Sequence, residues 1–375
     1  MSSDVKYIPL NSINPNFATV VEAENVYEVP PDVMGVIKAS QRLSIRQHVK
    51  VLPKQCFSCP PCVKQENTYS IYAGLNMDNY DEFMRVDEVS DDWNRCCCTP
   101  YHPVKLEVRQ FIPSPDANLQ NTSDWDHLKN DAAKDFGRFT KQRKADYMTE
   151  SYKRQPVLFT MVRDDGMRCC YKCPCKCLNT FVCFSCCQDG LHIYAGDIPN
   201  DPKELGRFEQ LPTEKLIGSA IQPNFGGCCT PTLHLFGPQT EEKPEPFGKI
   251  EGPCIFGGWS EMFCNFNFFV SNFKSPGKSG DLGLIVKEKP KSAANALQEL
   301  ISDADNYSIH FSGLDLTPEQ KVTILGGQLL ADYMFFDGNT EKCKQEGDTT
   351  TCYLCYCSII GAIIPCQCSI SSNSN

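Results

Sequence analysis

Residues 322–336, VTILGGQLLADYMFF, form an apolar segment that constrains the fold more than any other part of the chain. Thr317 is a good N-cap, Pro318 suits the first turn of a helix, and Gln320 completes a capping box. Gly338 is a natural helix stop. A helix that is apolar on nearly every side is buried in protein or in lipid. Either the fold or a membrane must therefore surround this helix.

The segment is short for a membrane span, which needs about 20 apolar residues to cross roughly 30 Å of hydrocarbon. The run has 15 residues and is interrupted by Gln328 and Asp332, and a central Asp costs about 2.5–3.5 kcal/mol on insertion scales. Gly326 and Gly327 would let a neighbouring backbone approach closely, as threading a helix through a narrow barrel would require. We expect a central core helix, with a transmembrane span as the alternative. The residues that would face the core or the membrane are Val322, Leu325, Leu329, Asp332, Phe335 and Phe336.

The residues before this helix follow a β-type pattern. Short apolar or alternating runs occur at residues 69–72, 104–108, 157–162, 191–194, 232–235 and 266–270. Because Gly, Pro and Asn separate them, they indicate an all-β sandwich or barrel. Residues 124–154 are highly charged, and we interpret them as a solvated helical insertion, with a basic membrane-contacting helix as the alternative. A short amphipathic helix is predicted over residues 292–302.

The net charge of −10 restricts the partners of the chain. Phosphate binding depends on Lys and Arg, so we expect no nucleic acid partner. A simple polybasic grip on anionic lipids is disfavoured for the same reason. If the chain sits on a membrane, something other than bulk charge must hold it there.

The 24 cysteines are grouped in clusters. The amino-terminal residues MSSDVKYIPLN contain no apolar run typical of a signal peptide. We therefore expect the chain in the reducing cytosol, where disulfides are rare. Metal binding, redox chemistry, S-acylation and inert packing remain as roles for the thiols.

Residues 302–336, SDADNYSIHFSGLDLTPEQKVTILGGQLLADYMFF, resemble the end of the phospholipid scramblase domain. Other landmarks of that family occur upstream in the same order. They are Pro30 and Pro31, residues 40–52, 67–73 and 94–97, Pro103, the block 167–187, and Gly252-Pro253-Cys254. The resemblance implies a mainly β, Tubby-like fold, a closed antiparallel barrel of about twelve strands around the apolar helix. It covers residues 30–338, with insertions near 111–156 and 199–213, after a flexible tail at 1–29 and before a cysteine-rich tail at 339–375.

The resemblance also implies a function. The family moves phospholipids across membranes in both directions, without ATP and with stimulation by calcium, and no covalent bond changes. We therefore expect no enzyme chemistry, and the six isolated histidines are interpreted as structural. The implied partners are membrane phospholipids, with protein partners or self-association possible, on the cytoplasmic side of the plasma membrane. The alternative is a palmitoylated, membrane-tethered lipid- or protein-binding scaffold without transport activity.

Eight cysteines of the central block match the palmitoylation block of the family. They are Cys169, Cys170, Cys173, Cys175, Cys177, Cys183, Cys186 and Cys187. Stable membrane anchoring takes two acyl chains rather than one, and neighbouring cysteines can supply several. Zinc and inert or redox thiols are the alternatives here. Zinc is a stronger alternative at Cys56, Cys59 and Cys62, whose spacing suits a tetrahedral site.

Two regions depart from the family. Its calcium-binding stretch should be rich in carboxylates, but residues 264–288 offer mainly Asn265, Asn267 and Asp281. Calcium prefers six to eight oxygen ligands, so we expect at most a weak site. The tail carries no charge from Thr349 on and holds five cysteines. We interpret it as a second acylated, membrane-dipping segment, with a transmembrane helix or a disordered tail as alternatives.

Overall fold

The computed structural model describes most of a β-barrel and the segment that follows it. The described residues are 31–48, 66–73, 82–90, 103–110, 155–163, 188–198, 213–238, 245–274, 280–290, 305–312, 316–336 and 342–371. The expected tail at 1–29, most of both insertions and the helix expected over 292–302 lie outside them.

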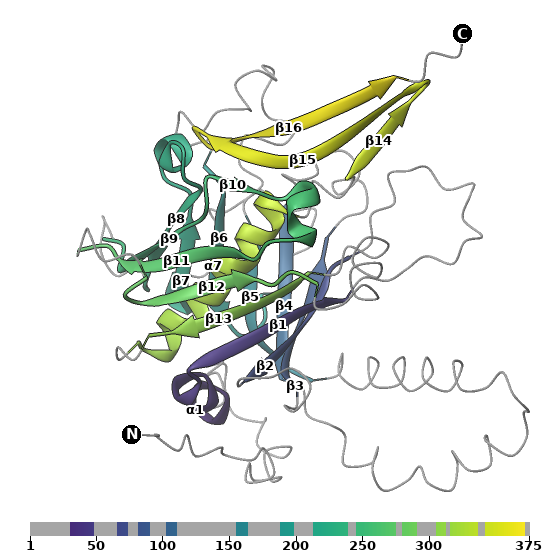
Figure 1. Cartoon of the computed structure of the whole chain (residues 1–375). Coiled ribbons are helices and arrows are strands. Elements are labelled where there is room, and N and C mark those ends of the chain that lie inside the picture. The colour runs from purple at the N-terminus through teal and green to yellow at the C-terminus, as the bar shows by residue number, and fades with distance from the viewer. Residues whose placement is uncertain are drawn as a thin grey trace, which may run out of the picture.

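Twelve antiparallel strands form a closed barrel (Figure 1). In chain order they are β1 (Arg42–His48), β2 (Thr68–Ala73), β3 (Glu82–Val89), β4 (Val104–Gln110), β5 (Val157–Arg163), β6 (Gly190–Ala195), β7 (Leu216–Ile221), β8 (Thr232–Phe236), β9 (Gly248–Glu251), β11 (Phe266–Asn272), β12 (Gly283–Lys287) and β13 (Asn306–Phe311). Neighbours in sequence pair with one another around the barrel, and β1 closes it against β13 with Ile45 opposite Tyr307. All six β-type runs of the sequence fall in these strands, and the expected barrel is confirmed.

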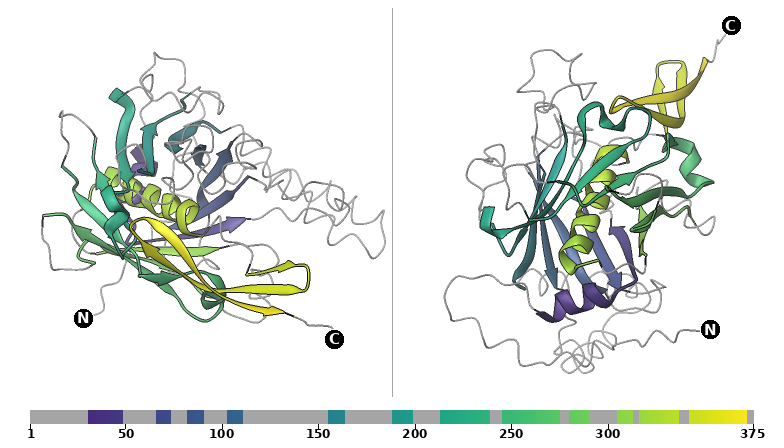
Figure 2. Two further views of the ribbon diagram at one scale, coloured as in Figure 1. Left: turned by 90° about the horizontal axis from the view of Figure 1, so that it is seen from above. Right: turned by 90° about the vertical axis from the view of Figure 1, so that its left-hand side faces the viewer.

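Helix α7 (Pro318–Phe335) runs through the barrel (Figure 2). The expected cap is present, because the Thr317 side chain accepts from the Gln320 backbone N–H while the Gln320 side chain accepts from the Thr317 N–H. The strands surround the helix, so every residue from Lys321 to Phe335 is buried. The core-helix prediction is therefore confirmed. None of the helices in the described residues is long and apolar enough to cross a membrane.

Glycines allow the close fit between helix and strands. A Cβ atom on Gly326 would lie 2.6 Å from Cδ1 of Ile193, and one on Gly327 would lie 2.6 Å from Cδ1 of Ile250. The expected close approach therefore exists, although the approaching atoms here are side chains. The backbone of strand β7 comes close to α7 at Gly218, where a Cβ would lie 2.2 Å from Thr323 Oγ1. The same Cβ would lie 2.8 Å from the carbonyl oxygen of Phe236 on β8.

Helix α1 (Pro31–Ala39) packs at the end of the barrel where α7 begins (Figure 1). The Lys321 ammonium on α7 donates to the carbonyls of Ile37, Lys38 and Ser40, at 3.3, 2.7 and 2.7 Å. The carbonyls of Ile37 and Lys38 belong to the last turn of α1, and Ser40 directly follows the helix. A side chain of the central helix thus caps the helix outside the barrel.

A second sheet lies at the opposite end of the barrel (Figures 1 and 2). Strand β15 (Thr349–Ile359) pairs with β10 (Ile255–Phe256), β14 (Cys343–Glu346) and β16 (Ala362–Ser371). Three 3-10 turns, η7 (Thr213–Lys215), η8 (Asn224–Gly227) and η9 (Gly258–Met262), complete the described elements. The helical and disordered alternatives for the tail are wrong for residues 342–371, because Thr, Tyr and Ile favour strands and Ile360 and Gly361 form a tight turn, with φ of 53° and 75°.

Candidate functional site at the cysteine end of the barrel

All 24 cysteines belong to chain segments attached to one end of the barrel, which we call the cysteine end. Strand pairing defines this end, because His48 is opposite Thr68, Val104 is opposite Arg163, and Gly190 is opposite Ile221. The segments that leave from here and contain cysteine are 49–67, 90–103, 164–189, 222–231, 252–265 and the chain after α7. By sequence, the segments that connect strands at the other end contain none.

The β15–β16 hairpin carries four free thiols on one face. Cys355 is opposite Cys366, and the sulfur atoms of Cys357 and Cys366 are 3.5 Å apart. Burial and the neighbouring Cys366 raise the pKa of the Cys355 thiol to about 11. The Cys355 thiol is thus protonated at neutral pH, a form that neither attacks electrophiles nor binds metal. Cys368 completes the set and is exposed.

The hairpin is fixed to the barrel by its other face and its tip. Tyr356 is 5% exposed and belongs to the core that includes Phe256. The Ile360 N–H donates to the carbonyl of Cys228 at 2.7 Å, so the tip of the hairpin rests beside η8. The hairpin is therefore a docked part of the fold.

One pair of described cysteines is bonded. Cys343 and Cys352 face each other across β14 and β15 with their Cα atoms 4.1 Å apart, and they form a disulfide. From the sequence we expect disulfides to be rare in this chain. This pair departs from that expectation because strand pairing places the two residues directly opposite each other.

A buried polar network lies beneath the cysteine end. The Asp332 carboxylate, 1% exposed on α7, accepts hydrogen bonds from the hydroxyls of Tyr69, at 2.6 Å, and Tyr307. Burial, together with Asp305 and Asp332, raises the pKa of Tyr307 well above its ordinary value. The phenol therefore stays protonated and donates. Asp332, which argued against a membrane span in the sequence, thus fixes α7 inside the barrel.

A buried lysine joins this network from β12. The Lys287 ammonium lies 2.7 Å from Asp305 and 3.2 Å from Glu261, and 3.7 Å from the centre of the Phe336 ring. Burial alone would lower the pKa of Lys287, but the carboxylates of Asp305 and Glu261 raise it. The ammonium therefore stays charged and holds η9 against the barrel.

Two further ion and hydrogen-bond contacts fix the same end. Tyr333 donates to Glu88 at 2.9 Å, and Arg163 forms a bidentate pair with Asp189 in which both side chains are almost fully buried. Each of these polar or charged groups has a complementary partner, which offsets the free-energy cost of burying it. Their geometry supports a structural role.

The eight predicted acylation cysteines, Cys169 to Cys187, lie outside the described residues, as do Cys56, Cys59 and Cys62. The described chain leaves the barrel at Arg163 and returns at Gln188, whose amide donates to Asn224 of η8 at 3.0 Å. No group of three metal-binding side chains with suitable geometry occurs within the described ranges. Palmitoylation and the zinc alternative remain predictions.

The three residues proposed for calcium do not meet. Asn265 accepts from the Lys289 N–H at 2.9 Å, at the cysteine end of β11. Asp281 accepts from the Asn272 N–H at 2.7 Å, at the other end of that strand. Asn267 lies on β11 with its side chain exposed. A strand of this length separates Asn265 from Asp281 by roughly 20 Å, so these oxygens cannot share one ion.

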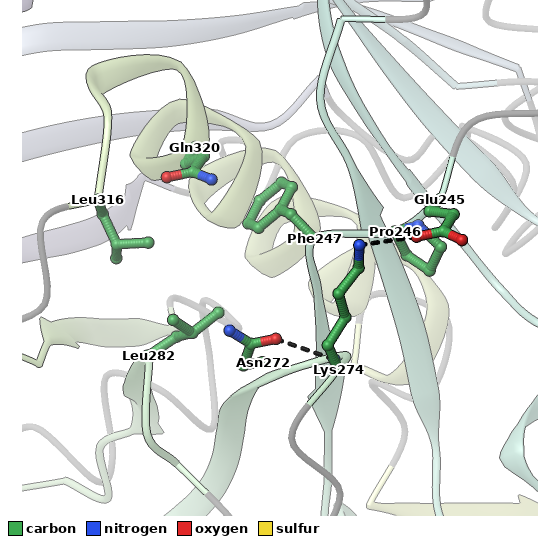
Figure 3. Close-up of a pocket in the computed structure, with 8 residues that line it drawn as sticks. All are labelled: Glu245, Pro246, Phe247, Asn272, Lys274, Leu282, Leu316 and Gln320. Atoms are coloured by element: carbon green, nitrogen blue, oxygen red, sulfur yellow. Dashed lines mark hydrogen bonds and ion pairs between the residues drawn. The ribbon is translucent and has the colours of Figure 1, made fainter. Parts of the chain in front are cut away.

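A separate pocket of about 430 Å³ opens at the far end of the barrel, beside the start of α7 (Figure 3). Its lining residues are Glu245, Pro246, Phe247, Asn272, Lys274, Leu282, Leu316 and Gln320. Lys274 and Glu245 form an exposed ion pair of 2.8 Å across it. The sequence analysis missed this pocket, since its residues come from four separate segments and no motif joins them.

The fold and the cysteine end define a cysteine-rich barrel closed around a central helix. Residues 167–338, from the central cysteine block through α7, match the Scramblase family model. This region, somewhat less than half of the chain, is similar to the phospholipid scramblase family.

The chain is 29% identical to phospholipid scramblase 1 of Rattus norvegicus over 171 residues, which cover 45% of this chain and 41% of the relative. It is 28% identical to phospholipid scramblase 2 of Bos taurus over 164 residues, which cover 44% of each chain. It is 30% identical to phospholipid scramblase 1 of Homo sapiens over 138 residues, covering 37% and 38%. The chain thus spans about two fifths of the length of these relatives. No solved structure matches it.

Proposed function

We propose that the chain moves phospholipids between the two leaflets of a membrane, in both directions, without ATP and without covalent chemistry. The observation that carries this proposal is the family match over residues 167–338, which includes strands β6 to β13 and the central helix. These residues form more than half of the barrel and its core.

The filled barrel restricts how lipids would move. Side chains of α7 from Val322 to Phe336 are buried within the strands, with relative exposures of 6% or less. A headgroup therefore has no path alongside the helix. We place the lipid path outside the barrel, through local distortion of the bilayer, self-association or a second protein.

Palmitoylation would hold the chain on the membrane. We propose that the eight cysteines from Cys169 to Cys187 are acylated and that the chain sits on the cytoplasmic side of the plasma membrane. Each buried CH₂ of an acyl chain contributes about 0.8 kcal/mol, so two or more chains hold an acidic protein without a basic patch. Palmitate labelling that persists after all eight are changed to Ser would contradict this assignment.

We propose calcium stimulation because the family is stimulated by calcium. Asn265, Asn267 and Asp281 would not bind the ion together, so other side chains would supply the ligands. Because these three residues lie far apart, we expect calcium to bind weakly, through other carboxylates of the chain. Isothermal titration of calcium into the wild type and the Asp281→Ala variant checks this, and we expect the same weak heats for both.

Purified full-length chain in vesicles tests the main proposal. The vesicles contain a fluorescent phosphatidylcholine, and dithionite is added outside, with calcium or with a chelator. Scrambling removes nearly all fluorescence, whereas protein-free vesicles lose only the outer half. Loss of half the signal from protein-containing vesicles under both conditions would contradict scrambling by the chain alone.

A second candidate is a membrane-tethered scaffold that binds lipids or proteins without moving lipid. The specific observation that favours it is the buried network around Asp332, which closes the interior to headgroups. A chain that binds vesicles but leaves half the fluorescence protected would support this candidate.

A further inference from the structure

We propose that the outward face of the β15–β16 hairpin, with the adjacent exposed side chains of β10 and η9, is the surface that rests on the bilayer. We call this surface the docking face and define it by Ile255, Phe263, Ile359, Ile364 and Ile370. Its occupant is the uncharged boundary between headgroups and acyl chains. This inference rests on the proposed membrane function, because it names the surface through which that function would act.

Exposed apolar side chains gather at this end of the molecule. Nine large hydrophobic residues in the described part of the chain are exposed, and seven of them lie at the cysteine end. The most exposed are Phe263 and Ile370, each at 69%, followed by Ile255 at 53%. The two others are Phe269 on the barrel wall and Phe273 at the far end. Gathering of this kind marks an interaction surface, whereas single exposed hydrophobic residues are ordinary.

Strand pairing places four of the docking-face side chains, Ile255, Ile359, Ile364 and Ile370, on one face, because Ile255 is opposite Cys357 of β15. Ile364 is opposite Cys357, and Ile359 is opposite Ala362. Because side chains alternate along a strand, Ile364, Cys366, Cys368 and Ile370 all point to the same side of β16. The opposite side faces the barrel, where Tyr356 and Ile363 pack against the core.

Charge identifies lipid as the occupant. The whole chain has a net charge of −10, yet no charged residue occurs from Thr349 to the last residue. A protein partner of this acidic chain would gain by matching its charge, whereas hydrocarbon requires a surface without charge. The docking face therefore suits a neutral lipid surface.

The described strands that precede the other cysteines also end on this side. Fourteen of the 24 cysteines lie outside the described ranges, and the strands that precede them end at the cysteine end, at His48, Val89 and Arg163. The ten described cysteines lie at the same end. The described strands that lead into these cysteine-containing segments therefore end on the side of the docking face.

The edge of the sheet sets the depth of contact. In the described structure β16 pairs only with β15, so the outer N–H and C=O groups of β16 are free of strand partners. An open strand edge is not stable within hydrocarbon, because its polar groups would be unsatisfied there. The hairpin therefore lies flat among the headgroups, with Ile364 and Ile370 directed toward the acyl chains.

Flotation of the full-length chain with vesicles of pure phosphatidylcholine tests the proposal. We expect binding that changes less than about twofold between 0.1 and 0.5 M NaCl, since no charge is involved. The double variant Ile364→Glu and Ile370→Glu should bind at least about tenfold more weakly, because each new carboxylate must leave water. The matched control is Phe273→Glu, an exposed apolar residue at the far end, which should bind as the wild type does.

Hydroxyl-radical footprinting of the wild type gives a second readout that needs no variant. Vesicles should protect Phe263, Ile364 and Ile370 from oxidation and leave Phe273 unchanged. Equal protection at both ends, no flotation of the wild type, or equal binding by the double variant would overturn the proposal. Protection of the hairpin without vesicles, together with a dimer in sedimentation, would overturn it in favour of an interface between two copies.

These outcomes are independent of lipid transfer. The chain could float with vesicles and yet leave half of the fluorescence protected in the scrambling assay. That result would contradict scrambling and support the docking face. If the chain scrambles lipid while vesicles fail to protect the docking face from oxidation, the proposed function is supported and the docking face is contradicted.

Discussion

The hydroxyl of Tyr69 donates a 2.6 Å hydrogen bond to the carboxylate of Asp332, a residue 263 positions later in the chain. One residue lies on β2 at the cysteine end, and the other lies near the end of the central helix. The bond therefore joins the wall of the barrel to the helix that fills it. Tyr307 of β13 donates to the same carboxylate, so the helix is tied to two strands on either side of β1.

Replacing Asp332 with Ala should destabilise the chain by about 3–5 kcal/mol. The change removes the carboxylate that accepts from Tyr69 and Tyr307, and it takes a negative charge away from the buried Lys287 ammonium. Tyr69→Phe should cost about 1–3 kcal/mol, because Asp332 keeps its bond from Tyr307. Urea unfolding followed by tyrosine and tryptophan fluorescence measures both. Tyr194→Phe is the control, since Tyr194 is buried but takes no part in this network, and it should change stability by less than about 0.5 kcal/mol. Equal effects of the two tyrosine changes would contradict the assigned role of Tyr69.

Replacing Gly218 with Ala should destabilise the barrel by about 1–3 kcal/mol through overpacking. The new Cβ would meet Thr323 Oγ1 at 2.2 Å and the carbonyl oxygen of Phe236 at 2.8 Å, and the backbone atom cannot rotate away. Gly237→Ala is the matched control, because a Cβ there meets nothing within 4 Å. Thermal unfolding of the two variants should differ clearly. A Gly218→Ala variant as stable as Gly237→Ala would show that α7 sits more loosely against β7 than described.

Acid should weaken the fold partly through His192. Burial lowers the pKa of His192 from 6.5 to about 4, and its Nδ1 lies 2.8 Å from the Ser219 hydroxyl. Below pH 6.5 the unfolded chain binds a proton that the folded chain does not, so the free energy of unfolding falls from pH 6.5 down to about pH 4 and then levels off. Between pH 7.5 and 5.0 this one residue should account for about 2 kcal/mol. The variant His192→Asn keeps a partner for Ser219 and should lose correspondingly less stability over that range, as urea unfolding at both pH values would measure. The same pH dependence in both proteins would contradict this role.

Replacing Gln328 with Leu should stabilise the chain by about 1–2 kcal/mol. Gln328 is 1% exposed on α7, and neither atom of its amide has a hydrogen-bonding partner among the described residues. A buried amide without partners costs free energy that a leucine of similar size does not. Denaturant unfolding measures the change, and Leu329→Ala, which removes a buried side chain without changing polarity, is the control that should destabilise by about 2–5 kcal/mol. Destabilisation by Gln328→Leu would show that the amide is satisfied.

The central helix and six of the strands could be predicted from the sequence because their signals are local. The capping box at Thr317 and Gln320 needs only four consecutive residues, and an all-apolar helix has few places to lie. Strands β1 and β3 are harder to predict, because charged residues interrupt their apolar pattern. In β3 the carboxylate of Glu88 is buried, and its partner Tyr333 is 245 residues away, so no local pattern could justify it.

The tail contains a local sequence signal for a β-hairpin. Ile360 and Gly361 stand between two runs that alternate in Thr, Cys, Tyr and Ile, and a two-residue turn ending in Gly favours a hairpin. Pro365 lies within β16, because proline is tolerated on an edge strand. The gathering of cysteines at one end could not be predicted from their spacing alone, because it depends on which strands run in which direction.

The closure of the barrel has a consequence for synthesis of the chain. Strand β1 pairs with β13, so the first strand must wait for residues 306–311 before its second edge is covered, and the apolar interior must wait further for residues 318–335. At roughly 5–20 residues per second, a ribosome needs about 15 s or more between these points. A nascent chain therefore exposes strand edges and apolar side chains throughout that interval, which makes it a client for chaperones until residues 318–335 have been synthesised.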